Sequence, residues 1–346
     1  MPRRAPRRAK RRPPDLSRPQ ERWVLDVEAG DDGKRLDAFL AARLPWRSRT
    51  AVQRLIHEGG VERRGRAGRP GERVRAGDAI TLRVAAPADA HPDPSAIPLQ
   101  ILHEDEWLVA LDKQPGVLVH PVGRHRTDTL ISALHARYRR EGAADRVPKL
   151  CHRLDRDTSG VWVVALDDRV RAQLGADFAG RRVAKEYRAL VRGVVREDAF
   201  AVRLPIGRDP DSPVRLKRRT GPAPDAQPAW TDVTVLDRYA GATLVACVPR
   251  TGRTHQIRVH LDGIGHPVLG DPLYGPQARP ERWTAPGHGC EPLRDAAGAV
   301  VLDRHALHAA RLAFTHPITG ERLTLEAPLP PDLVRCAAWL RAGGRP

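Results

Sequence analysis

The segment from Cys151 to Ala165 constrains this chain most, because it joins a reactive loop to a buried strand. Its first half, CHRLDRDTS, is dense in histidine, arginine, aspartate and hydroxyl side chains. Its second half, VWVVA, is apolar and rich in β-branched residues, which indicates a buried strand. Gly160 stands between the two halves, where backbone freedom or a close approach is useful. The segment therefore predicts an acidic, hydrogen-bonding loop held at the edge of a rigid sheet, a common position for a catalytic group.

Asp155 is the candidate reactive group of this loop. Taken alone it has a structural explanation, because loop aspartates commonly cap helices or bind their own backbone. The complete run HRLDRDTSG is more specific, and it resembles the catalytic signature of the RluA-type pseudouridine synthases, which isomerise uridine in ribosomal or transfer RNA. In that family the aspartate of HRLD is the nucleophile, so the resemblance implies this role for Asp155.

Two later segments extend the resemblance. Residues 183–193, VAKEYRALVRG, resemble the second family motif, KxY, and read as a strand with Lys185 and Tyr187 on one face. In the family this tyrosine packs on the target base and assists proton removal, whereas core packing is the alternative for a strand tyrosine. Residues 250–261, RTGRTHQIRVHL, resemble the third motif. By resemblance its Arg258 pairs with the catalytic aspartate, and Arg253 is the less favoured candidate.

The third motif also predicts a helix from Thr254 to Leu261. Arg253 and His255 would lie at its electropositive N-terminal end, which suits a phosphate group. His255 and His260 suggest a metal site, but no HExxH pattern or third ligand accompanies them, so no metal is expected.

The isomerisation that the resemblance implies needs no redox partner and no carrier of a transferred group, so no cofactor is expected. RNA contacts are expected in this domain from Arg153, Lys185, Arg253 and His255.

Residues 33–84 read as a small separate module. Apolar residues from Leu36 to Leu44 recur at helical spacing, a second helix after Ser48 ends at the glycine pair 59–60, and residues 80–84 alternate as a strand. The module resembles the alpha-L RNA-binding domain shared with ribosomal small-subunit protein four, although the Asn-Gly turn common there is replaced by VERRG. RNA contacts are expected from Arg47, Arg49 and Arg54, which could alternatively form a solvated face.

Four regions are expected along the chain. Residues 1–20 form a basic, proline-broken tail that is expected to be disordered, and residues 85–97 form a Pro/Ala/Asp-rich linker. Residues 98–340 are expected to form the catalytic domain, preceded by the small α+β module. By resemblance the catalytic domain is an α+β structure with a mixed, mostly antiparallel sheet. The strand-rich pattern from Leu99 onward agrees with that class.

The net charge of +17 favours a polyanionic partner. No apolar run reaches the length of a membrane span and no signal peptide is visible, so a cytoplasmic protein with an RNA partner and no membrane contact is expected. Ribosomal RNA, of the large subunit above all, is favoured over tRNA because a module before the catalytic domain is common in the ribosomal branch. A monomer is the default expectation.

Two other functions remain open at this point. A non-catalytic RNA-binding or ribosome-assembly protein would suit the charge and the small module. A metal-dependent nuclease or phosphoesterase that uses His/Asp pairs would need clustered carboxylates, and only Asp155 and Asp157 lie close together in the motifs. The joint presence of Asp155, Tyr187 and Arg258 favours the synthase.

Overall fold

The computed structural model describes residues 22–44, 49–83, 93–122, 127–276, 278 and 291–346. They fall into two compact units, one within residues 1–98 and 120–147 and the other within 99–119 and 148–346. The basic tail of residues 1–20 and residues 85–92 of the expected linker lie outside the described residues. Each unit is described by itself below.

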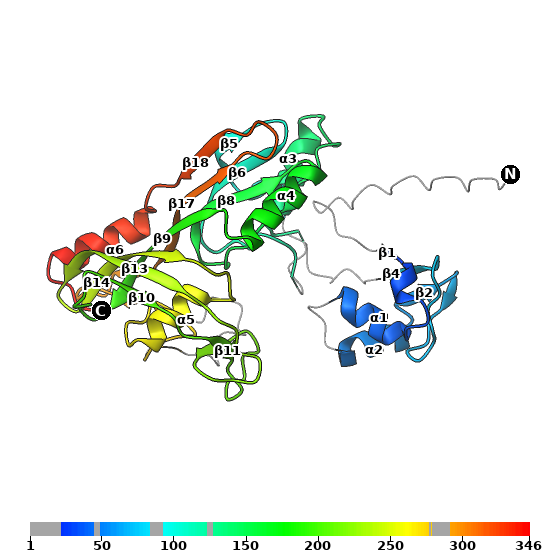
Figure 1. Ribbon diagram of the computed structural model, residues 1–346, viewed down its shortest axis with the longest axis horizontal. Coiled ribbons are helices and arrows are strands. Elements are labelled where there is room, and N and C mark those ends of the chain that lie inside the picture. Colours follow the sequence, from blue (N-terminus) through cyan, green and yellow to red (C-terminus); the bar gives the residue numbers. More distant parts are fainter. Residues whose placement is uncertain (1–21, 45–48, 84–92, 123–126, 277, 279–290) are drawn as a thin grey trace. The chain divides into compact units, whose positions relative to one another are not determined.

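The first unit contains a four-stranded antiparallel sheet with two helices (Figure 1). Its order is β1-β4-β2-β3, and the elements are β1 (Arg22–Asp26), η1 (Ala29–Asp31), α1 (Leu36–Arg43), α2 (Arg49–His57), β2 (Val61–Arg63), β3 (Arg66–Ala67) and β4 (Ala79–Arg83). Leu36, Phe39 and Leu40 of α1 pack with Ile56 of α2 and Ile80 of β4, because their helical or alternating spacing puts them on one face. The two predicted helices and the strand are confirmed, whereas β1 was not predicted.

The first unit also contains η2 (Pro94–Ala96) and α3 (Leu130–Arg140), which lie against each other. The Thr129 hydroxyl accepts a hydrogen bond from the Ser132 amide and caps α3. This helix is amphipathic and largely buried, with three arginines in its last turn where they complement the helix dipole.

The second unit is built on one ten-stranded sheet. The strand order is β10-β13-β14-β9-β17-β8-β6-β5, with β18 paired to β17 and β7 paired to β8. The bounds are β5 (Gln100–Glu104), β6 (Leu108–Lys113), β7 (Lys149–Leu150), β8 (Ser159–Ala165), β9 (Ala184–Arg192), β10 (Ala199–Val202), β13 (Thr231–Tyr239), β14 (Ala242–Pro249), β17 (Leu307–Thr315) and β18 (Arg322–Glu326). Every pairing is antiparallel except that of β17 with β8. The predicted mixed, mostly antiparallel sheet of an α+β protein is therefore confirmed.

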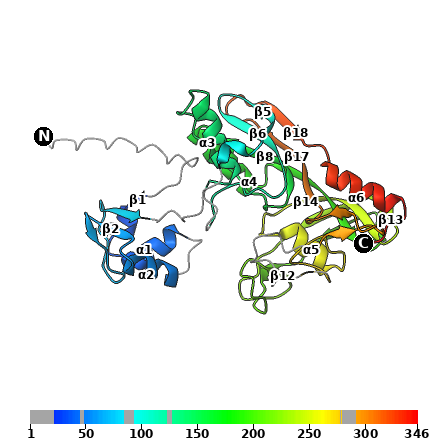
Figure 2. The ribbon, with the colours of Figure 1, turned by 180° about the vertical axis from the view of Figure 1, so that it is seen from behind.

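Helices and two hairpins complete the second unit. Helix α4 (Asp168–Ala179) packs on the β6–β8 part of the sheet, while α5 (Gln256–Gly263) and α6 (Pro331–Arg341) contribute to the core around β9 and β14 (Figures 1 and 2). The hairpins are β11 (Ile206–Arg208) with β12 (Arg218–Thr220) and β15 (Leu293–Arg294) with β16 (Val300–Leu302). Among the described residues, no helix is both long and apolar enough to cross a membrane.

The parallel contact of β8 with β17 lies where the motif loop enters the sheet. Ser159 and Gly160 are in register with His308 and Ala309. Gly160 has a φ of 106°, and a Cβ placed on it would lie 2.1 Å from the carbonyl oxygen of Ala309. A glycine is required here both by its backbone conformation and by the close approach of the neighbouring strand. The start of β8, and with it the end of the motif loop, is thereby fixed in the middle of the sheet.

We expect Gly160→Ala to destabilise the protein by more than about 2 kcal/mol, because backbone atoms rather than a flexible side chain occupy the space. Gly175→Ala in α4 is the matched control, since a Cβ there meets nothing within 4 Å and alanine favours a helix by about 1 kcal/mol. Denaturant unfolding of both variants measures the difference. Equal stabilities of the two variants would contradict this explanation of Gly160.

Candidate active site

The motif loop before β8 is held by a buried lysine. Lys113, at the end of β6, is 1% exposed and donates hydrogen bonds from Nζ to the carbonyl oxygens of Gln114, Arg156 and Thr158, at 2.9, 2.6 and 2.9 Å. Arg304 donates from Nη1 to the carbonyl oxygen of Asp157 at 2.9 Å. Two buried basic side chains, Lys113 and Arg304, therefore bind the backbone of the loop and fix its conformation.

The remaining polar side chains of the motif also serve the loop. The Thr158 hydroxyl is hydrogen-bonded to Nε2 of His305 at 2.8 Å, and the Ser159 hydroxyl to Nδ1 of His308 at 2.9 Å. His152 accepts a hydrogen bond at Nε2 from the Val163 amide, 3.0 Å away, and its ring stacks on Phe178. These residues are therefore engaged in holding the loop. The Asp157 carboxylate is buried and accepts hydrogen bonds from Arg156, which leaves Asp155 as the carboxylate that the loop presents.

Asp155 is paired with Arg258, as the sequence predicted. Nη1 of Arg258 donates to Oδ2 of Asp155 at 2.8 Å. The same guanidinium donates from Nε and Nη2 to the two carboxylate oxygens of Asp271, at 2.6 and 2.8 Å. Arg258 and Asp271 are buried, whereas the side chain of Asp155 is 33% exposed. The bidentate pair fixes the guanidinium, and the fixed guanidinium then orients a carboxylate that solvent or a substrate can reach.

The charge state of Asp155 follows from this pairing. Burial acts to raise the pKa of Asp155. His255 and His305, which are charged only when protonated in acid, act against burial together with the charge and the hydrogen bond of Arg258, and they hold that pKa well below its usual range. Burial lowers the pKa of His255 to about 4 and that of His305 to about 3, so both rings are neutral at pH 7. Arg258 is therefore the charge that keeps Asp155 ionised at neutral pH.

His255 and Tyr274 border the same carboxylate. Nε2 of His255 lies 4.0 Å from Oδ1 of Asp155, and its Nδ1 is hydrogen-bonded to the Tyr274 hydroxyl at 2.8 Å. His255 has a left-handed φ of 55° and is the N-cap of α5, so the helix begins at Gln256 rather than at Thr254 as predicted. The predicted start was wrong because the periodicity of the segment does not reveal a single left-handed residue. That conformation turns the imidazole toward Asp155 instead of leaving it in the first turn.

Gln256 holds the loop that leads to His255. Its Oε1 accepts from the Thr251 hydroxyl and the Arg253 amide, at 2.7 and 3.0 Å. Its Nε2 donates to the carbonyl oxygen of Trp230 and to the Thr231 hydroxyl, at 2.9 and 3.0 Å. The amide is thus fully hydrogen-bonded in a buried position, which fixes the N-terminal end of α5 on β13.

Tyr187 and Lys185 lie on β9, as predicted. Tyr187 is in register with Cys247 of β14 and Ala309 of β17, and it packs against the core while remaining partly exposed. Burial and the negative charge of Asp155 raise the pKa of Tyr187 above its ordinary value, which places its phenol within the electrostatic reach of that carboxylate. Burial lowers the pKa of Lys185, which lies two residues earlier on the same face.

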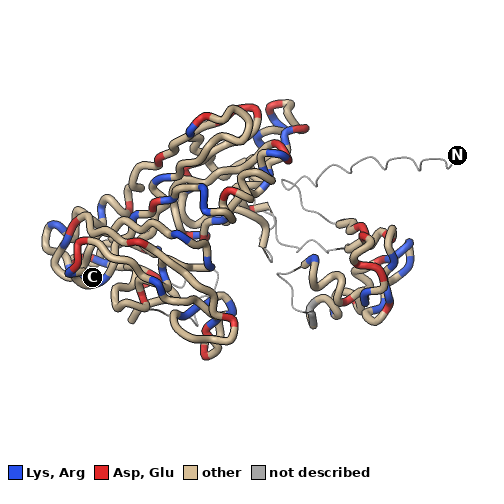
Figure 3. The backbone as a smooth tube through the Cα atoms, viewed as in Figure 1, with Lys and Arg blue, Asp and Glu red and all other residues tan. Residues whose placement is uncertain are grey.

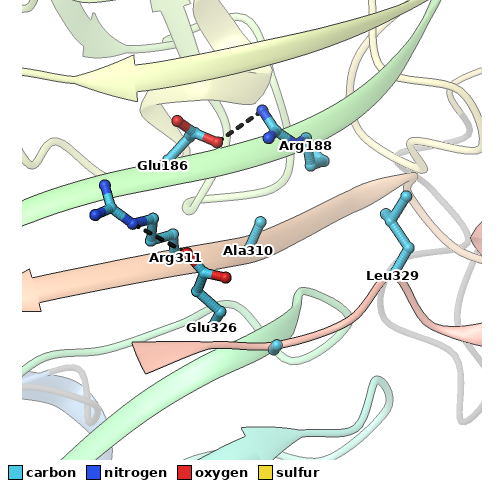
Figure 4. A pocket seen from close by; sticks show the side chains of 7 residues that line it. Glu186, Arg188, Ala310, Arg311, Glu326 and Leu329 are labelled. Carbon is cyan, nitrogen blue, oxygen red and sulfur yellow. Dashed lines mark ion pairs between the residues drawn. The ribbon is translucent and has the colours of Figure 1, made fainter. Parts of the chain in front are cut away.

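The opposite face of β9 carries a separate cavity of about 270 Å³ (Figure 4). Glu186 and Arg188 of β9 form an ion pair of 2.7 Å there, and Arg311 and Glu326 form one of 3.2 Å. Successive residues of a strand point to opposite faces, so these side chains point away from the face of Tyr187. Because each carboxylate in this cavity has its own arginine, the cavity offers no equivalent of the accessible Asp155 carboxylate.

The residues predicted to contact RNA are placed as follows. Arg153 is exposed in the motif loop, and Arg54 is exposed on α2. Arg253 donates from Nε to the carbonyl oxygen of Pro228 at 3.1 Å, so it does not pair with Asp155. Arg47 lies outside the described residues, and for Arg49 only the backbone, the first residue of α2, is described.

His255 and His260, the two histidines that suggested a metal site, both have hydrogen-bond partners within the protein. His260 is hydrogen-bonded through Nδ1 to the Thr231 hydroxyl and through Nε2 to the carbonyl oxygen of Leu204, both at 2.9 Å. His255 uses Nδ1 for Tyr274. Over the described ranges, no group of three or more His, Cys, Asp or Glu side chains is arranged to hold a metal ion.

Sequence reasoning missed four residues of this site, namely Lys113, Asp271, Tyr274 and Arg304. Two signals were present. Asp271 and Tyr274 lie in GHPVLGDPLYG, which follows shortly after the third motif, and no role was predicted for either residue. Lysine is rare beside arginine in this chain, and a lysine directly after an apolar strand is a candidate for burial. Arg304 carried no such signal.

The pKa of Lys113 makes the anchoring testable. Burial lowers this pKa to about 7, against the raising effect of Asp157, whereas an unfolded lysine titrates near 10.5. Between these values the unfolded chain binds more protons than the folded protein, so the free energy of unfolding rises with pH. Lys113 should make the free energy of unfolding rise by up to about 1.4 kcal/mol per pH unit between pH 7 and 10, and we expect this contribution to be absent in Lys113→Met. Urea unfolding at several pH values measures it, and parallel curves for the two proteins would contradict the assignment.

Comparisons with known proteins agree with this geometry. Residues 107–262 match the family model of RNA pseudouridylate synthase. The chain is 36% identical to the ribosomal large subunit pseudouridine synthase D of Neisseria meningitidis serogroup A, covering 94% of this chain and 83% of that protein. It is 34% identical to an uncharacterized RNA pseudouridine synthase, YlyB, of Bacillus subtilis, covering 92% of this chain and 99% of that protein.

A solved structure supports the fold as well. The human protein RNA Pseudouridylate Synthase Domain Containing 4 superposes with a TM-score of 0.54 at 29% identity, covering 70% of this chain and 93% of the human chain. Asp155, Tyr187 and Arg258 all lie within the matched range of residues 107–262. The chain therefore belongs to the RluA-type RNA pseudouridine synthases, isomerases that act on RNA, and it carries a small antiparallel-sheet module consistent with an alpha-L RNA-binding domain before the catalytic sheet.

Proposed function

We propose that this enzyme isomerises uridine in large-subunit ribosomal RNA, in the cytoplasm, with Asp155 as the catalytic carboxylate. The observation that carries the proposal is the contact of Asp155 with Arg258, because a partly exposed carboxylate is kept ionised by an arginine that is itself fixed by Asp271. The choice of RNA is supported by relatives named ribosomal large subunit pseudouridine synthase D that cover most of the chain.

The reaction defines what the site must supply. The bond between N1 of uracil and C1′ of ribose breaks, the ring turns, and a bond forms between C5 and C1′. The proton on C5 is lost and N1 takes one up, so atoms and charge balance without an oxidant or a transferred group. An ionised carboxylate beside the sugar and the base can act as the nucleophile or the base in this sequence. Asp155 has the charge state and the access for that role.

Tyr187 is proposed to receive the target base. A uridine in folded RNA must leave its stack before Asp155 can reach it, and an aromatic face offsets part of that cost. Tyr187 is partly exposed, lies on a rigid central strand and is close enough to Asp155 for the carboxylate to raise its pKa. Because its phenol stays protonated at neutral pH, Tyr187 offers a face and a hydroxyl rather than a phenolate.

Affinity is proposed to come from the positive charge of both units. Lysine and arginine residues occur at many positions in both units (Figure 3). Exposed arginines such as Arg54 of the small module and Arg153 of the motif loop, together with Lys185 and Arg253, would bind phosphate groups and carry little sequence information. The small module would recognise folded RNA by shape more than by base identity.

Release of tritium from C5-labelled uridine tests the proposed substrate. Large-subunit ribosomal RNA, small-subunit ribosomal RNA and tRNA, each purified from cells that lack this enzyme, are incubated separately with the protein. We expect release from the large-subunit fraction alone. Release from tRNA alone would replace the proposed substrate while leaving the proposed chemistry in place.

A further inference from the structure

The hydrogen bonds around His255 support one further assignment, which goes beyond the proposed function and rests on it. The Tyr274 hydroxyl lies 2.8 Å from Nδ1 of His255, and the Arg218 amide donates to the same hydroxyl oxygen at 3.1 Å. Tyr274 is 3% exposed and the side chain of His255 is 6% exposed. The hydroxyl is therefore enclosed between a backbone donor and an imidazole.

This arrangement selects one tautomer of His255. The Arg218 amide can only donate, so the Tyr274 oxygen accepts from it. If Nδ1 of His255 also donated to that oxygen, the phenolic proton would need another acceptor, and the hydrogen bonds of the described residues provide none. A buried hydroxyl proton without an acceptor costs about 1–3 kcal/mol. The favoured arrangement has Tyr274 donating to Nδ1, which leaves the proton of the neutral ring on Nε2.

The ring stays neutral although charged groups surround it. Burial lowers the pKa of His255 to about 4, and the charges of Arg258 and Arg218 act in the same direction. Asp155 and Asp271 act in the opposite direction but do not reverse the effect. At neutral pH the ring therefore presents an N–H donor without a positive charge.

The donor points toward the proposed reaction site. Nε2 of His255 lies 4.0 Å from Oδ1 of Asp155, a distance too long for a direct hydrogen bond. When the bond between N1 and C1′ breaks, or when a nucleophile adds to the ring, negative charge develops on the carbonyl oxygens of uracil. A fixed N–H donor next to the attacking carboxylate would stabilise that charge.

We propose that His255 donates a hydrogen bond from Nε2 to a uracil carbonyl oxygen during isomerisation, and that Tyr274 is the positioning residue that holds His255 in the required tautomer. The Arg218 amide couples this arrangement to the β11–β12 hairpin, because it binds the hydroxyl that holds the imidazole. The hairpin thus has a direct connection to the reaction site.

The test combines a tautomer measurement with kinetics. Protein labelled with ¹⁵N-histidine is examined at pH 7 without RNA, and the His255→Gln variant identifies the His255 signals. We expect a protonated Nε2 and an unprotonated Nδ1 in the wild type, and a loss of that preference in Tyr274→Phe. In single-turnover tritium release we expect Tyr274→Phe to be about tenfold slower, with unchanged affinity for RNA, and His255→Leu to be about a hundredfold slower. His255→Gln, which retains an N–H near the Nε2 position, should recover most of the rate.

Tyr239→Phe is the matched control, since it removes a tyrosine hydroxyl at the far end of β13 and should not change the rate. A native His255 protonated at Nδ1 would overturn the proposal even if Tyr274→Phe failed to fold. So would equal rates for Tyr274→Phe and Tyr239→Phe, or equal rates for the Gln and Leu variants. These outcomes require normal release by the wild type, whereas no release from any RNA would overturn the proposed function as well.

Discussion

Asp155→Asn will lower the single-turnover rate of tritium release from C5-labelled ribosomal RNA by at least about a thousandfold. Asparagine keeps the size of the side chain and can accept the hydrogen bond from Arg258, but it has neither the charge nor the nucleophilic oxygen of the carboxylate. Arg258 keeps its bidentate bond to Asp271 in the variant, so the fold should be retained. Affinity for RNA should change little, because a carboxylate contributes no attraction to phosphate.

Asp168→Asn is the control for this variant, since Asp168 begins α4 with a side chain that is 80% exposed, and its only ion pair among the described residues is with Lys149 at 3.2 Å. It should release tritium at the wild-type rate. An Asp155→Asn protein that binds RNA and retains more than about a tenth of the wild-type rate would mean that another group performs the chemistry.

Arg258→Leu will cost both stability and activity. The variant leaves Asp271 buried without its cation, and breaking a buried ion pair typically costs about 3–5 kcal/mol. It also removes the charge that keeps Asp155 ionised, so burial would raise the pKa of the Asp155 carboxyl. Urea unfolding measures the first effect and single-turnover tritium release measures the second.

The double variant Arg258→Leu with Asp271→Asn separates the two effects. Asp271 accepts hydrogen bonds from the Leu273 and Tyr274 amides at 2.9 and 3.2 Å. Asparagine at this position can still accept both hydrogen bonds, but it leaves no buried charge. We expect most of the lost stability to return while the rate remains low. A single Arg258→Leu variant as stable as the wild type would contradict the described ion pair.

Much of the fold could be predicted because its strands are strongly patterned. Residues 161–165 form an unbroken apolar run and became the buried strand β8, while Lys185 and Tyr187 alternate with charged residues on β9. The strand β1 was missed because RWVLD is short and stands beside a tail of basic residues. The parallel pairing of β8 with β17 joins segments far apart in the chain, which no local pattern specifies.

The candidate site was predictable for residues that stand in the motifs with a proposed chemical role, and unpredictable for residues that support another side chain. Asp155 and Arg258 stand in motifs, and the structure brings them into contact as expected. The bidentate role of Asp271 depends on a fold that places it beside Arg258. The apolar strand before Lys113 makes burial of this lysine possible, but its role under the motif loop depends on the fold that brings the carbonyl oxygen of Arg156 to it.

The proposal that this enzyme forms pseudouridine through Asp155 is tested by comparing two quantities in one reaction. Large-subunit ribosomal RNA labelled at C5 of uridine is treated with the wild-type enzyme, and released tritium is measured beside the pseudouridine formed, which nucleoside analysis quantifies. We expect equal amounts of released tritium and of pseudouridine, at a small number of positions, and neither product with Asp155→Asn. Intact RNA binding without either product, in every RNA fraction tried, would contradict the proposal.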